Sequence, residues 1–171
     1  MKVTVLSKDE VANYKPKKTL RQKPILIRIK DNGIWTTYPN IRHINRYKSV
    51  FETSFLDIEV LPHETERQRI YKDEMFNEQI ALDLLDFIKN NLNNTSEIVI
   101  HCTAGERRSK AVGLIILSHI LKDYKQYEQL SKNNDFPRGN YMVYQIFGQT
   151  CIKYNWYASF YCVFIVDVLY L

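Results

Sequence analysis

Hydrophobic and polar positions follow a strand-like pattern at five places in the chain. Residues 2–6 alternate briefly, and residues 24–29 form a β-branched run that a turn-forming Asp31-Asn32-Gly33 follows. Residues 49–51 and 55–60 are further strand candidates. Residues 97–101 have almost no polar interruption, which is typical of a central parallel strand covered on both faces.

Three longer segments have the spacing of helices. In residues 76–92 the apolar positions recur every three or four residues, and Asn77 is placed to cap the helix with Phe76 packed before it. Residues 109–121 predict a buried helix, and 139–150 a last one. We interpret residues 62–75 as a charged loop. Strands that alternate with helices predict an α/β fold with a central, mostly parallel sheet flanked by helices.

Composition places the chain among ordinary globular proteins. Its 171 residues are 45% hydrophobic and 25% charged, with five Gly and five Pro, which excludes disordered and collagen-like classes. This length predicts one domain with its own core. Three Cys argue against a disulfide scaffold, so we expect a reducing, cytoplasmic setting in which each thiol is a candidate for chemistry.

Charge is spread unevenly along the chain. Residues 1–50 hold twelve Lys or Arg against three Asp or Glu, a net charge of +9, whereas residues 51–100 hold four against eleven. The basic first segment favours an anionic ligand such as a phosphoprotein, a nucleic acid or a membrane surface, or is simply a solvated lysine-rich face.

The two ends differ in character. The opening residues are too short an apolar stretch for a secretory signal. Residues 156–171 are mostly apolar but fall short of the roughly twenty that a spanning helix needs, and they include Asp167, so no transmembrane segment is expected. A buried element, a surface or partner contact, and a frayed tail all remain open. We divide the chain into a main domain at 1–150 and an apolar extension at 151–171.

The most informative stretch is the loop between the predicted strand at 97–101 and the predicted helix at 109–121. Its residues run His101-Cys102-Thr103-Ala104-Gly105-Glu106-Arg107-Arg108-Ser109. Such a loop can curl so that its backbone N–H groups, from Thr103 to Arg108, point to one centre. The N-terminus of the following helix adds further N–H groups, and the whole forms a nest for a tetrahedral oxyanion.

Side chains of this loop suit phosphate chemistry. Arg108 can bind two phosphate oxygens through its planar fork. The same positive field favours the thiolate of Cys102, which would then point at the phosphorus as a nucleophile. Ser109 can donate a hydrogen bond to the sulfur and help it leave. His101 is expected to support the loop by bonding to backbone groups rather than to act as a base.

These residues resemble a known family. His101-Cys102, five residues and Arg108-Ser109 are similar to the signature of cysteine-based protein tyrosine phosphatases, and Ala104-Gly105 and the small size look most like the dual-specificity branch. The first half resembles small phosphatases of phages and bacteria. The resemblance covers roughly residues 20–150 and implies a phosphatase domain at 1–150. It also implies cleavage of phosphate monoesters through a cysteinyl-phosphate, with no metal and no cofactor.

Two features depart from that family pattern. Glu106 and Arg107 stand where the family usually has small or apolar residues, and we expect both side chains to face solvent. The family also uses an Asp on a separate loop as general acid, and no clear copy of that loop is present. Asp73 lies close to the family's offset before Cys102 and is the candidate acid; His63 and Glu64 are rivals, and absence of an acid is the third possibility.

The sequence therefore supports three alternative hypotheses of function. The first hypothesis is a protein phosphatase that acts on phosphotyrosine, with phosphoserine and phosphothreonine as further possible substrates. The second is an RNA 5′-phosphatase on the same fold, which the basic first segment would suit. The third is a phosphate-binding module without efficient catalysis.

Overall fold

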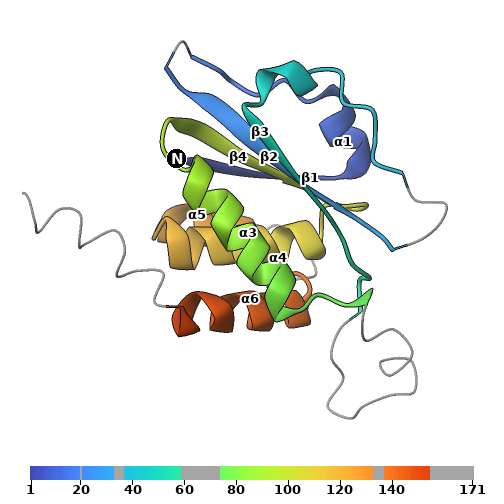
Figure 1. Cartoon of the computed structure of the whole chain (residues 1–171), viewed down its shortest axis with the longest axis vertical. Helices are drawn as coiled ribbons and strands as arrows, with labels where there is room; N and C mark the ends of the chain where they lie inside the picture. The colour runs from blue at the N-terminus through green and yellow to red at the C-terminus, as the bar shows by residue number, and fades with distance from the viewer. Residues whose placement is uncertain (20, 33–36, 59–73, 133–136, 155–171) are drawn as a thin grey trace, which may run out of the picture.

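A four-stranded parallel sheet forms the centre of the molecule. The computed structural model describes residues 1–19, 21–32, 37–58, 74–132 and 137–154. Within them the sheet has the order β1-β4-β2-β3, and every neighbouring pair is parallel. The predicted α/β class with a parallel sheet is confirmed (Figure 1). The four strands are β1 (Lys2–Leu6), β2 (Lys23–Lys30), β3 (Ser49–Ser54) and β4 (Thr95–His101).

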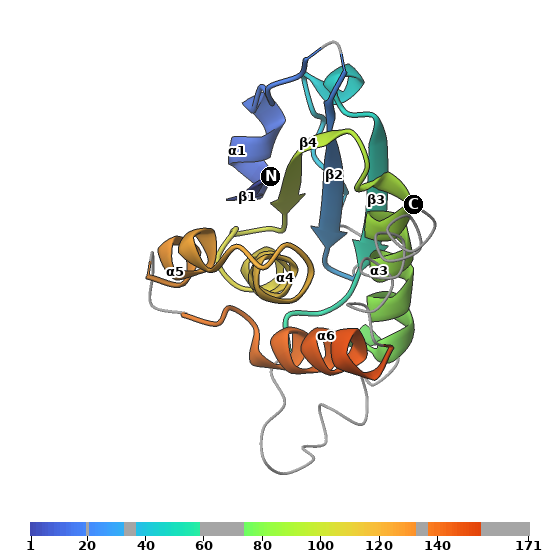
Figure 2. The same ribbon diagram turned by 90° about the vertical axis from the view of Figure 1, so that its left-hand side faces the viewer.

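Helices cover both faces of this sheet (Figure 2). On one face lie α3 (Glu78–Asn91), α4 (Arg108–Ile115) and α6 (Tyr141–Lys153), which share the main apolar core with the sheet. On the other face α1 (Lys8–Asn13) packs with the residues that flank the 3₁₀ turn η1 (Ile44–Arg46) around a smaller core.

Strand β4 is buried from both sides, as its uninterrupted apolar sequence predicts. Ile98 and Ile100 point into the main core, whereas Val99 points into the smaller one. Strand β2 divides in the same way, with Ile25 on the main side and Leu26 on the other. The two central strands, β4 and β2, therefore fix the positions of the loop residues that follow their carboxyl ends.

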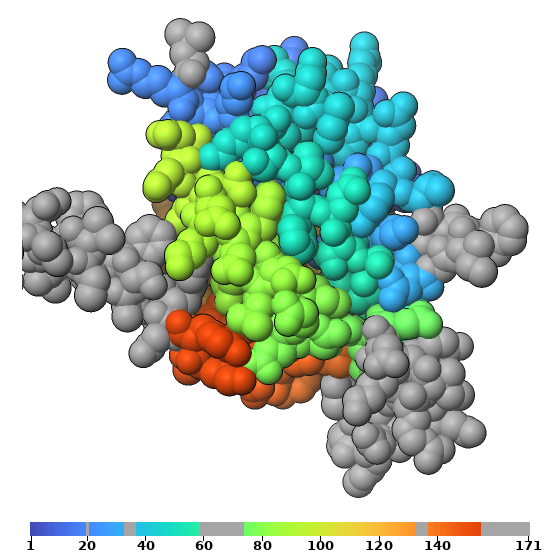
Figure 3. All heavy atoms as spheres, viewed as in Figure 1, coloured from blue at the N-terminus to red at the C-terminus, as the bar shows by residue number. Residues whose placement is uncertain are grey.

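Helix α3 begins where the sequence predicts. The Asn77 side chain accepts a hydrogen bond from the Ile80 backbone N–H at 3.0 Å, which caps the helix. Phe76 is buried just before it, and its ring centroid lies 4.9 Å from that of Phe55. Figure 3 shows α3 directly beside the β3 region on one face, where Phe51 and Phe87 have their ring centroids 5.3 Å apart.

Several elements differ from the sequence-based expectation. The short helix α1 and the polar helix α5 (Tyr124–Lys132) were not predicted. The predicted strand at 55–60 is wrong for its described part, since β3 ends at Ser54 and residues 55–58 are irregular. There the backbone leaves the sheet, because the Leu56 N–H donates to the Glu74 carbonyl at 2.8 Å. After α4 the chain continues as a π-helical segment, η3 (Ile116–Ile120).

The predicted division at residue 150 falls inside a helix. Helix α6 runs on to Lys153, and Cys151 is fully buried in the main core. The first residues of the predicted extension therefore belong to the domain itself, and residues 155–171 lie outside the described part of the chain.

Candidate active site

The cysteine loop lies between the carboxyl end of β4 and the amino end of α4. Strand β4 ends at His101 and helix α4 begins at Arg108, as the sequence predicts. Residues 102–107 form a series of bends that connect the two elements. Helix α4 has no side-chain cap at its first turn. Its free N–H groups and the positive end of its dipole are thus directed at the loop.

Two neighbouring segments support the loop from behind. The Lys8 N–H at the start of α1 donates to the Thr103 carbonyl at 3.0 Å. Gly105 has φ +81°, and a Cβ atom there would lie 2.7 Å from the backbone nitrogen of Ser7. On the other side, the Arg107 carbonyl accepts a 3.0 Å hydrogen bond from the N–H of Asn140, which follows the left-handed Gly139. The loop is therefore held by backbone contacts, and at Gly105 these leave no room for a side chain.

The sulfur of Cys102 is buried and has two hydrogen-bonding neighbours. The residue is 2% exposed, and its Sγ lies 3.1 Å from Ser109 Oγ. The Gly105 backbone N–H donates to the same sulfur at 3.3 Å. The sulfur is therefore in contact with both the loop backbone and the first turn of α4.

Arg108 is buried beside the cysteine and is held in one orientation. Its Nη1 donates to the Phe55 carbonyl at 2.9 Å and lies 2.7 Å from Asp31 Oδ1, and its Nη2 donates to Thr103 Oγ1 at 3.2 Å. Within the described residues its buried Nε has no hydrogen-bond partner. A buried donor without an acceptor is uncommon, and it marks the side of the guanidinium where an anion would bind.

Two carboxylates that the sequence analysis did not single out also lie at the loop. Asp31, just after β2, contacts Arg108 as described above. Asp57 follows the end of β3, and its Oδ2 lies 3.4 Å from Arg107 Nε and 4.0 Å from Arg108 Nε. The buried Asn140 holds Asp57 by donating from Nδ2 to Oδ1 at 2.6 Å. Both Asp residues follow parallel strands, and that position was the available signal in the sequence.

The three acids proposed from the sequence lie outside the described residues. Asp73, His63 and Glu64 all belong to residues 59–73. The assignment of Asp73 as general acid therefore stays a prediction. Asp57 is the described carboxylate that lies beside the unpartnered Nε of Arg108.

The remaining loop residues are divided between core and surface. Glu106 is exposed, as expected. Arg107 is partly buried, in contrast to the expectation, and pairs with Asp57. His101 is 1% exposed, and neither ring nitrogen has a hydrogen-bond partner in the described structure. Burial, followed by the charge of Arg28, lowers the pKa of His101 to about 4, against a smaller opposing effect of the Cys102 backbone. The expectation that His101 bonds to backbone groups is therefore wrong for its ring nitrogens, because the neutral ring is buried without hydrogen bonds in the described part of the chain.

A small cavity of about 100 Å³ lies beside the cysteine on the α1 side of the sheet. Its lining includes Cys102 and Thr103 from the loop, and Lys8 and Lys30 from the first half of the chain. Asp31, the carboxylate of this lining, contacts Arg108. The lysines bring positive charge to the edge of the site, which favours anionic groups there.

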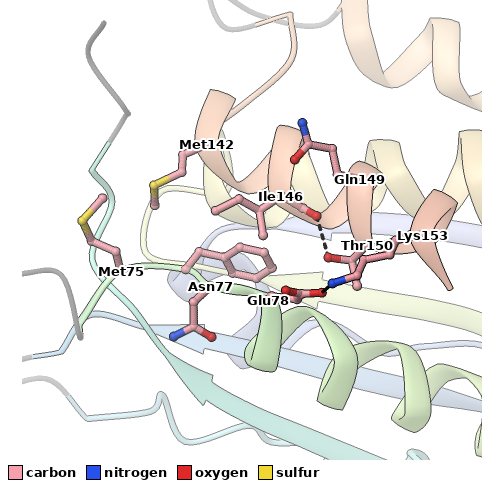
Figure 4. Close-up of a pocket in the computed structure, with 9 residues that line it drawn as sticks. Met75, Asn77, Glu78, Met142, Ile146, Gln149, Thr150 and Lys153 are labelled. Atoms are coloured by element: carbon pink, nitrogen blue, oxygen red, sulfur yellow. Dashed lines mark hydrogen bonds and ion pairs between the residues drawn. The ribbon is translucent and has the colours of Figure 1, made fainter. Parts of the chain in front are cut away.

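A larger cavity of about 610 Å³ lies elsewhere, between the start of α3 and α6 (Figure 4). Met75, Met142 and Ile146 give it an apolar wall, and a 2.6 Å ion pair between Glu78 and Lys153 lies along its lining. No residue of the cysteine loop lines it, so its size does not make it the reaction site.

Within the described part of the chain, no three His, Cys, Asp or Glu side chains gather in a way that could hold a metal ion. No helix among the described residues is long and apolar enough to cross a membrane.

Comparison with known proteins adds no family assignment. A scan of the sequence against protein-family models gives no match, and a search of curated proteins gives none either. The chemistry of the site is therefore the basis on which a function can be proposed.

Proposed function

We propose that this chain is a cysteine-dependent phosphatase that hydrolyses phosphate monoesters, with a fold of the protein tyrosine phosphatase type. The observation that carries the proposal is the arrangement around the cysteine. A buried thiol with two hydrogen-bonding neighbours lies in a loop that ends at a buried arginine whose Nε lacks a partner. A phosphoryl group would supply the missing acceptor and would place its phosphorus before the sulfur.

The proposed reaction has two steps. In the first, the Cys102 thiolate attacks phosphorus and the ester oxygen leaves with a proton, which forms a cysteinyl-phosphate and the free alcohol. In the second, water attacks the phosphorus, the S–P bond breaks and inorganic phosphate is released. Ser109, 3.1 Å from the sulfur, would stabilise the departing thiolate. Arg108 and the loop N–H groups would stabilise the charge on the equatorial oxygens in both steps.

We assign the proton transfer to Asp57 among the described carboxylates. It lies on the Nε side of Arg108, where the phosphoryl group would bind, at 4.0 Å from Nε. Asp31 instead lies 2.7 Å from Nη1, so it contacts a different nitrogen of the guanidinium. Asp73 is the rival from the sequence, and substitution separates the two.

Substrate choice follows from the anionic preference of the site. Phosphotyrosine in a protein is the proposed substrate, with phosphoserine and phosphothreonine as further candidates. Lys8 and Lys30 beside the site would also suit the 5′-phosphate of an RNA, which is the second candidate. Steep salt dependence of KM with a 5′-phosphorylated RNA, and no turnover of phosphopeptides, would favour RNA.

The deciding experiment measures turnover and the covalent intermediate together. The wild-type protein is assayed with an aryl phosphate, a phosphotyrosine peptide, a phosphoserine peptide and a 5′-phosphorylated RNA, and acid quenching traps the phosphoenzyme. We expect Cys102→Ser to lose turnover and the trapped species but to keep phosphate binding. Cys151→Ala is the matched control, because burial raises the pKa of this core thiol to about 12. Full activity of Cys102→Ser would exclude the covalent mechanism. Phosphate binding without turnover in the wild type would indicate the binding module instead.

A further inference from the structure

Asp31 connects the two ends of the cysteine loop. It follows the last residue of β2, and its Oδ2 accepts a hydrogen bond from Thr103 Oγ1 at 2.9 Å. Its Oδ1 lies 2.7 Å from Arg108 Nη1. Thr103 completes the triangle, because its Oγ1 also accepts from Arg108 Nη2 at 3.2 Å. One carboxylate thus contacts the residue after the nucleophile and the arginine at the far end of the loop.

These contacts determine which donors of Arg108 remain for a ligand. The two hydrogens of Nη1 are directed to Asp31 and to the Phe55 carbonyl, and one hydrogen of Nη2 is directed to Thr103. In the described part of the chain, Nε makes no hydrogen bond. Because one of the two Nη2 hydrogens lies on the same side of the planar group as the Nε hydrogen, this side is the one that a ligand can use. That side is the one that can bind two oxygens of a phosphoryl group at once.

We infer that Asp31 is a positioning residue that fixes the Nε–Nη2 side of Arg108 toward the phosphoryl oxygens. The inference rests on the proposed phosphatase function, because it concerns the same site. Asp31 acts through Arg108 and does not touch the reacting atoms. Its carboxylate also prevents Nη1 from competing for the anion. Without it, the guanidinium can rotate, and a misplacement of about 1 Å at a reacting centre costs on the order of a hundredfold in rate.

A simpler structural role for Asp31 makes a different prediction. If the carboxylate only holds the loop together through Thr103, its removal should lower activity whatever residue stands at position 108. If it orients the guanidinium, its removal should matter only while a guanidinium is present. A double-mutant cycle between positions 31 and 108 therefore separates the two roles.

The cycle compares wild type, Asp31→Ala, Arg108→Lys and the double variant, with kcat and KM for a phosphotyrosine peptide. We expect Asp31→Ala to lower kcat by about 30- to 100-fold, with KM changed less than about threefold. Arg108→Lys should itself lose most activity, and in that background Asp31→Ala should cost less than about twofold. Asp31→Asn keeps an acceptor oxygen of the same shape and should recover part of the loss. Asp9→Ala, which removes an exposed carboxylate of α1, is the control for lost charge and should leave kcat unchanged.

The result that overturns the inference is an equal loss from Asp31→Ala in both backgrounds, or no loss in the first. Thermal unfolding of each variant identifies a folding defect, and Asp31→Asn then replaces Asp31→Ala in the cycle. If the wild type shows no turnover, the proposed function is wrong. The same four proteins are then compared by their affinity for inorganic phosphate, measured by calorimetry. Coupling between positions 31 and 108 in that measurement would still support the positioning role, and additivity would refute it.

Discussion

Replacing Asp57 by Asn tests the assignment of the general acid with little change to the fold. The amide keeps an oxygen in the place of Oδ1, so it can still accept the 2.6 Å hydrogen bond from Asn140 Nδ2. Two charge pairings of Asp57 are lost. One is with the buried Arg108 at 4.0 Å, and the closer one is with Arg107 at 3.4 Å, where both side chains are a little under one-third exposed. Such partly exposed pairs contribute at most about 1 kcal/mol. We therefore expect the melting temperature to fall by no more than a few degrees.

The effect on catalysis should be larger than the effect on stability. Proton transfer by a positioned side chain contributes about 10²- to 10⁴-fold to a rate. We expect Asp57→Asn to lower kcat for phosphotyrosine by about a hundredfold or more, which corresponds to about 2.7 kcal/mol of activation free energy. An aryl phosphate whose leaving group has a low pKa needs little proton donation and should lose less than about fivefold. The alkaline limb of the pH–rate profile should flatten, because it reports loss of the acid's proton.

The assay is steady-state kinetics on both substrates across pH, with Asp73→Asn measured in parallel. An unchanged kcat for phosphotyrosine in Asp57→Asn, together with a flattened alkaline limb in Asp73→Asn, would refute our reasoning and support the position predicted from the family's offset. Equal losses on both substrates in Asp57→Asn would also refute it, since an acid is needed more by the poorer leaving group.

Three further predictions concern the loop and its surroundings. Gly105→Ala should abolish most activity and lower the melting temperature, because a Cβ at φ +81° would lie 2.7 Å from the Ser7 nitrogen and 2.8 Å from the Leu6 carbonyl carbon. A kcat equal to that of the wild type would contradict this, since it would show that the loop can shift to accept the methyl group. Burial is the main cause that lowers the pKa of His101 to about 4 in the folded protein, so as pH falls the unfolded chain takes up this proton before the folded protein does. This group should therefore reduce the free energy of unfolding by up to about 3 kcal/mol as pH falls from about 6.5 to 4. Urea titrations at several pH values check this, and a His101→Asn variant with the same acid sensitivity would contradict it. Lys8→Gln with Lys30→Gln should raise KM for an acidic phosphopeptide about two- to fivefold at low salt and leave kcat unchanged; a KM independent of both charge and salt would remove these lysines from substrate binding.

Local chemistry explains which parts of the fold the sequence could predict. The cap at Asn77, the apolar periodicity of α3 and the buried run of β4 depend on residues close together in the chain, and all are confirmed. Helix α1 has a local signal too, since Ser7 and Glu10 form a reciprocal capping box. It was missed because only one of its residues, Val11, is buried, and one position gives no periodicity.

Tertiary contacts explain what the sequence could not predict. The alternation at residues 55–60 suggested a strand, but Phe55 is buried against Phe76 and its carbonyl accepts from Arg108. The last bond to β2 is from the Phe55 N–H to the Lys30 carbonyl, and the next N–H, that of Leu56, donates to Glu74 instead. Helix α5 has no buried residue, and its polar sequence gave no core-facing pattern to detect.

The candidate site shows the same division between local and distant information. Cys102, the proposed nucleophile, could be recognised together with Arg108 and Ser109 because the three lie within eight residues of one another, at a strand-to-helix junction. The carboxylates Asp31 and Asp57 contribute from the ends of β2 and β3, and their approach to Arg108 depends on strand order, which the sequence does not display. A parallel sheet brings the carboxyl ends of neighbouring strands to one edge, and this geometry lets three separate segments meet at one guanidinium. A cysteine loop of the same sequence placed after an edge strand would keep its backbone nest but would lack one neighbouring strand end. The central place of β4, between β1 and β2, is therefore as much a requirement of the proposed chemistry as the loop itself.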